Sequence, residues 1–148
     1  MKIGVLGTGM AGQAVGEKLA QLGHEVMMGS RKAGSEKAVC NTDSLAEQIQ
    51  RTFPEARVVK TLNTVNTSVM VNPASVPGDH VVFVSGNDAD AKRTVVEILG
   101  SIGWPERRVY DLGDISTARG PEMYMALWLR LIRVVGGPGF NIEIRRAT

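Results

Sequence analysis

The sequence predicts an α/β fold with a mainly parallel sheet. Three observations lead to this class: short apolar runs alternate with amphipathic segments, the first runs are continuous as in strands covered on both faces, and a glycine-rich turn follows the first run. The chain has 148 residues, 43% of them hydrophobic. That size predicts one domain over residues 1–148, with a C-terminal helix and tail (120–148) packed on it.

The first 30 residues have the pattern of a strand–helix–strand unit. Residues 2–6 form an apolar strand, and residues 10–22 carry apolar side chains along one helical stripe. Gly23 is placed to end that helix, and residues 25–28 give a second strand. A unit of about 30 residues is typical of a βαβ motif.

The rest of the chain continues the alternation. Further strands are expected at residues 58–62, 80–84 and 109–112, and residues 140–144 alternate as an edge strand or docking tail would. Helices are expected at residues 44–53, 89–102 and 121–135. Their predicted inward-facing side chains include Leu45, Ile49 and Phe53 in the first of these helices, and Met123, Leu127, Leu131 and Val134 in the last.

Composition excludes several classes of function. The net charge of +2, from 17 basic and 15 acidic residues, is too small for a nucleic-acid-binding face. No apolar run approaches the roughly 20 residues of a membrane helix, and no signal peptide is evident. Cys40 is the single cysteine, and His24 and His80 lack ligand spacing, so no metal site is expected. These features predict a cytoplasmic protein.

The glycine-rich turn is the motif that points to a ligand. Residues 7–12, GTGMAG, match G-x-G-x-x-G between a strand and a helix, the context that dinucleotide binding requires. The first glycine permits the turn, the second lets a pyrophosphate approach the backbone, and the third allows close helix packing. The alternative is a structural turn without ligand. The predicted cofactor-binding residues here are Gly7, Thr8, Gly9, Met10, Ala11 and Gly12.

The end of the second strand indicates which dinucleotide binds. NAD-preferring sites place a carboxylate there, whereas this sequence has Ser30, Arg31 and Lys32. A hydroxyl and a guanidinium favour a 2′-phosphate, so NADP(H) is the predicted cofactor of a Rossmann-like fold. A basic surface turn is the alternative. The remaining residues offer no catalytic triad or carboxylate pair, and hydride transfer needs none.

At these residues the sequence resembles the NADPH-dependent reductases of deazaflavin (coenzyme F420). The opening segment with its Ser-Arg pair, and the later segments VVKTLNTVN, VFVSGNDADAK, VYDLGDISTARGPEMY and LWLRL, are similar to family segments in the same order. The resemblance implies a homodimer, coenzyme F420 as a possible co-substrate, and contact with that substrate by Asn63, Thr64, Asn66 and the helix near residues 123–128. For the two asparagines, simple turn formation is the alternative.

Relative to that family the sequence is shortened between Cys40 and Asn41, where family members carry a segment worth two or three strands. We therefore expect a compacted Rossmann-like sheet in which residues 58–62 pair with residues 3–6. Pairing of the exposed edge with another copy of the chain is the alternative.

Three functional hypotheses remain open from the sequence. The leading one is an NADP(H)-dependent oxidoreductase that moves hydride to or from a deazaflavin or flavin-like acceptor. The second is an NADP(H)-binding module without turnover, since the missing segment bears on nicotinamide positioning. The third is an assembly protein that uses the helix at residues 123–135 as an interface.

Overall fold

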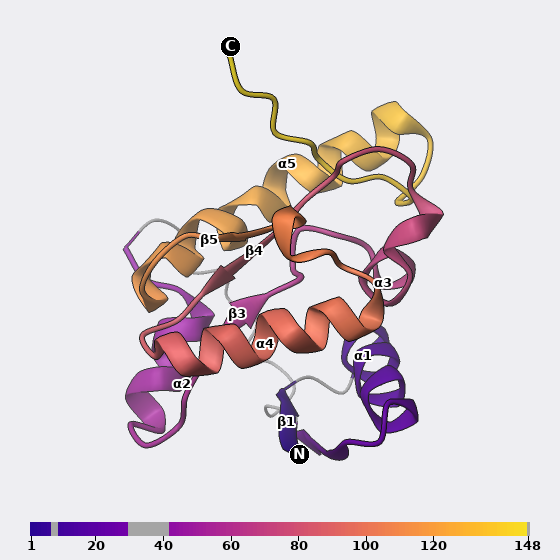
Figure 1. Cartoon of the computed structure of the whole chain (residues 1–148). Coiled ribbons are helices and arrows are strands. Elements are labelled where there is room, and N and C mark those ends of the chain that lie inside the picture. Colours follow the sequence, from indigo (N-terminus) through magenta and orange to yellow (C-terminus); the bar gives the residue numbers. More distant parts are fainter. Residues whose placement is uncertain (7–8, 30–41, 148) are drawn as a thin grey trace.

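The computed structural model describes residues 1–6, 9–29 and 42–147 of the chain (Figure 1). Strands and helices alternate, as the sequence predicts. Their order is β1 (Lys2–Leu6), α1 (Met10–Gln21), β2 (Glu25–Gly29), α2 (Leu45–Thr52), β3 (Lys60–Thr61), α3 (Thr67–Val71), β4 (Val82–Ser85), α4 (Ala89–Ile102), β5 (Val109–Asp111) and α5 (Arg119–Val135). Short 3₁₀ turns lie at Pro73–Ser75, Glu106–Arg108 and Ile115–Ala118.

The N-terminal βαβ unit is confirmed. β1 and β2 are parallel and in register from Lys2↔Glu25 to Leu6↔Gly29. α1 ends where Gly23 adopts a left-handed backbone (φ +83°), a conformation that glycine adopts without steric cost. The fold is therefore Rossmann-like at its N-terminus, with the parallel strand pair that the motif requires.

The second sheet corrects one prediction. β3 does not pair with β1; its register is antiparallel with β4, Lys60↔Ser85 and Thr61↔Val84, and β4 is parallel to β5. Among the described residues, β1 and β2 form a separate two-stranded sheet. One face of β4 lies in the core, with Val82 and Val84 at most 1% exposed, and β3 pairs with this buried strand.

Both sheets nevertheless share one hydrophobic core. Val82, Val84, Leu99 and Trp104 are fully buried in it, and Leu19 of α1 joins them. The half-buried apolar side chains of β1 and β2 pack against the same cluster, and α1 contacts α3. The core therefore holds the βαβ unit against the second sheet, although the sheets are not hydrogen-bonded to each other in the described residues.

α5 turns a different face inward from the one predicted. Of the four residues predicted to face inward, Leu131 is half-buried, but Met123, Leu127 and Val134 are 44%, 54% and 82% exposed. Pro121 is buried and Trp128 is half-buried. The prediction was wrong for those three residues because the whole helix is rich in apolar residues, so periodicity alone did not locate its covered stripe. Phe53 is likewise 58% exposed at the end of α2, not part of its inner face.

Candidate functional site

The carboxyl ends of β1 and β2 define the predicted dinucleotide edge. Leu6 and Gly29 are partners in the parallel register, so the glycine-rich turn and the basic turn leave the sheet at neighbouring positions. Ligands of open α/β sheets bind at this edge. Five predicted cofactor residues lie outside the described part of the chain: Gly7, Thr8, Ser30, Arg31 and Lys32.

The start of α1 has the properties of a phosphate seat. Gly9 is its N-cap residue, with an extended backbone (φ −72°, ψ 177°) and no side chain to cap the first amides. The first turn, which includes Ala11 and Gly12, holds no acidic residue. A Cβ added at Gly9 would meet no described atom within 4 Å. Uncapped amides, a favourable helix dipole and open space fit a pyrophosphate group at this position.

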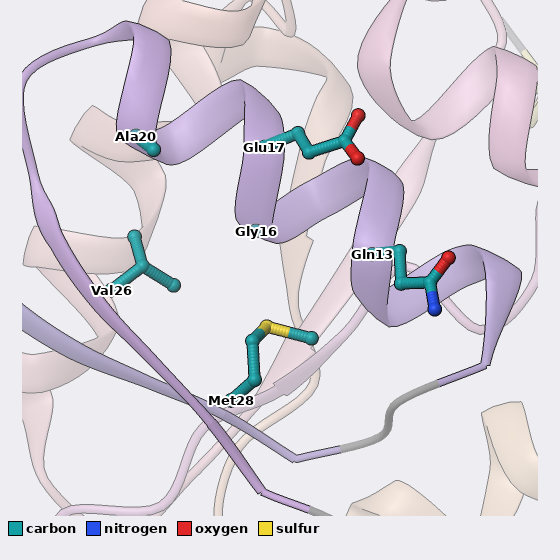
Figure 2. Close-up of a pocket in the computed structure, with 6 residues that line it drawn as sticks. All are labelled: Gln13, Gly16, Glu17, Ala20, Val26 and Met28. Carbon is teal, nitrogen blue, oxygen red and sulfur yellow. The ribbon is translucent and has the colours of Figure 1, made fainter.

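A shallow hollow of about 320 Å³ lies between α1 and β2. Figure 2 shows Met28 reaching from the strand toward Gly16 of the helix, where an added Cβ would lie 2.7 Å from the Met28 sulfur. Its lining is mainly apolar, and its charged member is the carboxylate of Glu17. The carboxylate of Glu17 disfavours a phosphate group in this hollow.

The loop after β3 is strained and carries unpaired polar atoms. Leu62 has a left-handed backbone (φ +65°) although it is buried and not glycine. Such residues cost about 1–3 kcal/mol each and cluster at functional sites. Thr64 is 3% exposed, and its hydroxyl has no hydrogen-bond partner among the described residues. An unpaired buried polar group costs about 1–3 kcal/mol. Backbone strain and an unpaired hydroxyl within three residues mark this loop as a candidate functional segment.

The two asparagines of this loop are engaged differently. Asn66 caps α3: its Oδ1 accepts from the N–H of Thr67 at 2.7 Å, and its Nδ2 donates to Ser68 at 3.0 Å. Asn63 donates from Nδ2 to the carbonyl of Pro121 at 2.7 Å, but its buried Oδ1 has no partner in the described residues. The turn-forming interpretation thus accounts for Asn66 and for only half of the Asn63 amide.

The first turn of α5 is fixed against α2 and β3. The carboxylate of Glu122 accepts from the N–H groups of Leu45 at 2.8 Å and Ala46 at 3.3 Å, at the start of α2. It also pairs with Lys60 at 3.1 Å, and both side chains are less than 20% exposed. An anion at a helix N-terminus is stabilised by the free amides and the helix dipole. α5 is therefore held beside the loop that carries Asn63.

A second ion pair strengthens the same junction. Arg119 donates from Nε and from its terminal nitrogen to Glu47, at 2.9 and 2.6 Å. The hydrogen bond from Arg119 lowers the pKa of Glu47 below its ordinary value of 4.5, against the smaller opposing effect of burial. A two-point contact of this kind fixes orientation as well as distance.

The aromatic residues of α5 mainly pack within the chain. Trp128 stacks on Phe140 of the C-terminal tail, with ring centroids 6.1 Å apart and planes inclined by 26°. The Trp128 indole nitrogen and the Tyr124 hydroxyl are buried without a partner among the described residues. Burial raises the pKa of Tyr124. The stacking supports a packing role for Trp128.

Several features of this region had no signal in the sequence. Pro121 and Glu122 reach their partners across 58 to 77 residues of chain, so no local spacing could reveal them. The unpaired hydroxyl of Thr61 also went unpredicted. In the described part of the chain, no His, Cys, Asp and Glu side chains gather in a group that could hold a metal ion. Of the helices described there, none combines the length and apolarity that a membrane crossing requires.

Comparison with known proteins identifies a family and structurally similar proteins. Residues 2–102 match the family described as NADP oxidoreductase, coenzyme F420-dependent. Among solved structures, a candidate F420-dependent NADP reductase from Arthrobacter sp. FB24 is similar, at 38% identity and a TM-score of 0.85. That alignment covers 99% of this chain and 100% of the other. Comparison with curated proteins gives no match.

Proposed function

This chain belongs to the family of coenzyme F420-dependent NADP oxidoreductases, and we propose that it transfers hydride between NADP(H) and a deazaflavin or flavin-like acceptor. Membership of that family supports an NADP-linked oxidoreductase role. The observation that carries the proposal is the parallel register ending at Leu6↔Gly29. It supports a single ligand edge formed by the glycine-rich turn and the basic turn.

In this proposal the dinucleotide is held by backbone at one turn and by side chains at the other. The amides at the start of α1, from Met10 to Gly12, bind the pyrophosphate, and Gly9 permits its approach. Ser30 and Arg31 bind the 2′-phosphate, with Lys32 adding longer-range attraction. The absence of an acidic residue from the first turn of α1 supports an anionic ligand there.

The second substrate is proposed to lie against the loop after β3. NADP(H) supplies the hydride chemistry when bound, so the protein must hold two rings in contact and exclude water. Asn63 and Thr64 are the residues proposed to contact it, and both lie within two residues of Leu62, whose left-handed backbone is typical of a functional segment. No residue is assigned a proton-transfer role.

The proposal is tested by mixing the purified protein with NADPH and an oxidised deazaflavin and following the absorbance of both. We expect loss of NADPH absorbance matched by deazaflavin reduction, with NADH a poorer donor. A flat trace at saturating concentrations of both would refute hydride transfer to this acceptor class.

A second candidate function is an NADP(H)-binding module without turnover. The observation that favours it is the separation of the β1–β2 sheet from the β3–β5 sheet within the described residues. This separation of the sheets would alter the surface against which a nicotinamide ring rests. It would leave the proposed phosphate-binding amides at the start of α1 unchanged. Tight NADPH binding without oxidation by any deazaflavin or flavin would favour this candidate over the enzyme.

We also propose that α5 mediates a homodimer. At 3.6 residues per turn, exposed apolar side chains flank its covered stripe on both sides. They are Met123, Leu127 and Val134 on one flank and Met125 and Leu129 on the other, each at least 40% exposed. Light scattering tests the proposal: a dimer is expected for the wild type, and a monomer for Leu127→Glu. A monomeric wild type would contradict it.

A further inference from the structure

The tail, residues 138–147, turns back after α5 and docks just before β4 (Figure 1). Gly136 ends α5 with a left-handed backbone (φ +85°), and a Gly-Gly-Pro-Gly run at residues 136–139 leads into the tail. The N–H of Val81 donates to the carbonyl of Ile142 at 3.0 Å, and His80 forms an antiparallel bridge with Glu143. Because this is an isolated bridge and not a ladder, side-chain contacts must help to hold the tail.

One such contact is made with the ring of His80. This residue is 2% exposed, and its ring lies edge-on against Trp104 with centroids 5.1 Å apart. Its Nε2 lies 3.0 Å from the carbonyl oxygen of Pro73 and 3.0 Å from that of Val76. Carbonyl oxygens only accept hydrogen bonds, so Nε2 must carry the ring proton.

The other ring nitrogen is left to accept a hydrogen bond from the tail. The Nδ2 atom of Asn141 lies 3.0 Å from Nδ1 of His80 and donates to the carbonyl of Val81 at 2.8 Å. The Oδ1 atom of Asn141 accepts from the N–H of Ile142 at 2.8 Å. These two partners fix the amide with its nitrogen toward the ring. The docked tail therefore needs a neutral imidazole whose Nδ1 carries no hydrogen.

We propose that the tail is a proton-controlled strap, docked while His80 is neutral and released when Nδ1 of that ring takes up a proton. A protonated ring donates from both nitrogens, so its Nδ1–H would face the NH₂ group of Asn141 with no acceptor between them. The cost of leaving buried donors unpaired corresponds to a change of at least about tenfold in the docking equilibrium. Release uncovers the face of Trp128 on which Phe140 stacks.

The charged groups near the bridge do not offer a replacement acceptor. In the part of the chain that the structure describes, they are Asp79, Arg107, Arg108, Glu143 and Arg145. Each carboxylate is already bound by an arginine, at 2.6 Å for Asp79 and 3.0 Å for Glu143. Residues 73–76, which hold Nε2, carry no ionisable side chain. A proton on Nδ1 of His80 therefore meets the amide of Asn141 and not a free anion.

Amide hydrogen exchange followed by NMR tests the strap, and the Val81 N–H is the reporter because it donates to the tail. The N–H of Leu112, which donates to Val84 of β4, is the internal control. After correction for intrinsic exchange rates, protection of Val81 relative to Leu112 should fall at least about tenfold from about pH 7.5 to about pH 5.5. The chain has two histidines, so His24→Gln is the matched control and should keep this fall.

Two variants distinguish protonation of the ring from ordinary packing. His80→Gln has no group at this position that changes charge in the range, so its Val81 protection should be equal at both pH values. Asn141→Asp places a carboxylate beside Nδ1 that pairs with the protonated ring, so its Val81 protection should rise on acidification. Constant protection in the wild type, or its loss together with that of Leu112 in a single transition, would overturn the inference. An unchanged fall in Asn141→Asp would overturn it too.

Discussion

Replacing Gly9 by serine should move stability and cofactor binding in opposite directions. Gly9 is the N-cap of α1, and its backbone angles (φ −72°, ψ 177°) are open to any residue. A Cβ there meets no described atom within 4 Å. The fold therefore gives no reason for glycine at this position. Serine is the better N-cap and also lowers the entropy of the unfolded chain, so the free energy of unfolding should rise by about 0.5–1 kcal/mol.

The same substitution places a side chain where the pyrophosphate is proposed to approach the backbone. Its hydroxyl also competes for the amides of the first turn of α1. We expect the affinity for NADPH to fall by at least about tenfold. Urea denaturation of the protein without cofactor measures the first effect, and calorimetry with NADPH measures the second.

Gly4→Ser is the matched control. Gly4 lies within β1, where an added Cβ also meets no described atom within 4 Å, and it is not part of the glycine motif. It should leave NADPH affinity unchanged. If Gly9→Ser is folded and binds NADPH as tightly as the wild type, the proposed approach of the pyrophosphate to Gly9 is wrong. A clear loss of folding stability in Gly9→Ser would instead contradict the inference that the fold does not require glycine at position 9.

Three further predictions concern the basic turn and the junction of α5. Arg31→Ala should weaken NADPH binding about 10- to 100-fold in calorimetry and leave NADH binding unchanged, and equal losses for both would contradict the 2′-phosphate contact. Glu122→Ala should lower the free energy of unfolding by about 2–4 kcal/mol in urea, because it leaves two amides and a cation unpaired; a loss below about 0.5 kcal/mol would contradict this. Because Arg119 depresses the pKa of Glu47 in the folded state, the stability from that pair is present above the ordinary value of 4.5 and is lost as the pH falls through the lower folded value. Glu47→Gln should therefore cost less stability at about pH 3 than at about pH 7 in thermal denaturation, and a constant cost across that range would refute the assignment.

Local signals predicted the N-terminal unit because they report on local structure. The strand before the glycine turn, the stripe along α1 and the glycine after it depend on residues within one or two turns of each other. The caps of α2 and α4 are equally local: Ser44 and Asp88 accept from the N–H groups three residues further on, those of Glu47 and Ala91.

The arrangement of later elements depended on contacts that sequence spacing does not record. β3 was expected beside β1, yet the covered strand β4 is its partner. The covered face of α5 was assigned from periodicity in a helix whose apolar residues occupy most of its circumference. Two residues of its first turn fix its actual orientation. Glu122 binds the start of α2 and Lys60, and Arg119 binds Glu47. All of these partners are more than 60 positions away in the chain.

In the candidate site, too, local sequence signals predicted one part, and long-range contacts determine the other. The motif predicted that Gly9 would open α1, and the structure places it there. The sequence did not distinguish Asn63 from Asn66, because both are asparagines in one polar loop. Only the hydrogen bonds show that the Oδ1 atom of Asn66 caps α3, whereas the Oδ1 atom of Asn63 has no partner among the described residues.

Calorimetric titration of the wild-type protein with NADPH and, separately, with NADH tests the central claim most directly. A seat built from uncapped helix amides beside a basic turn should bind NADPH at least about tenfold more tightly than NADH. Equal affinity for the two dinucleotides, or no heat of binding with NADPH, would contradict the account.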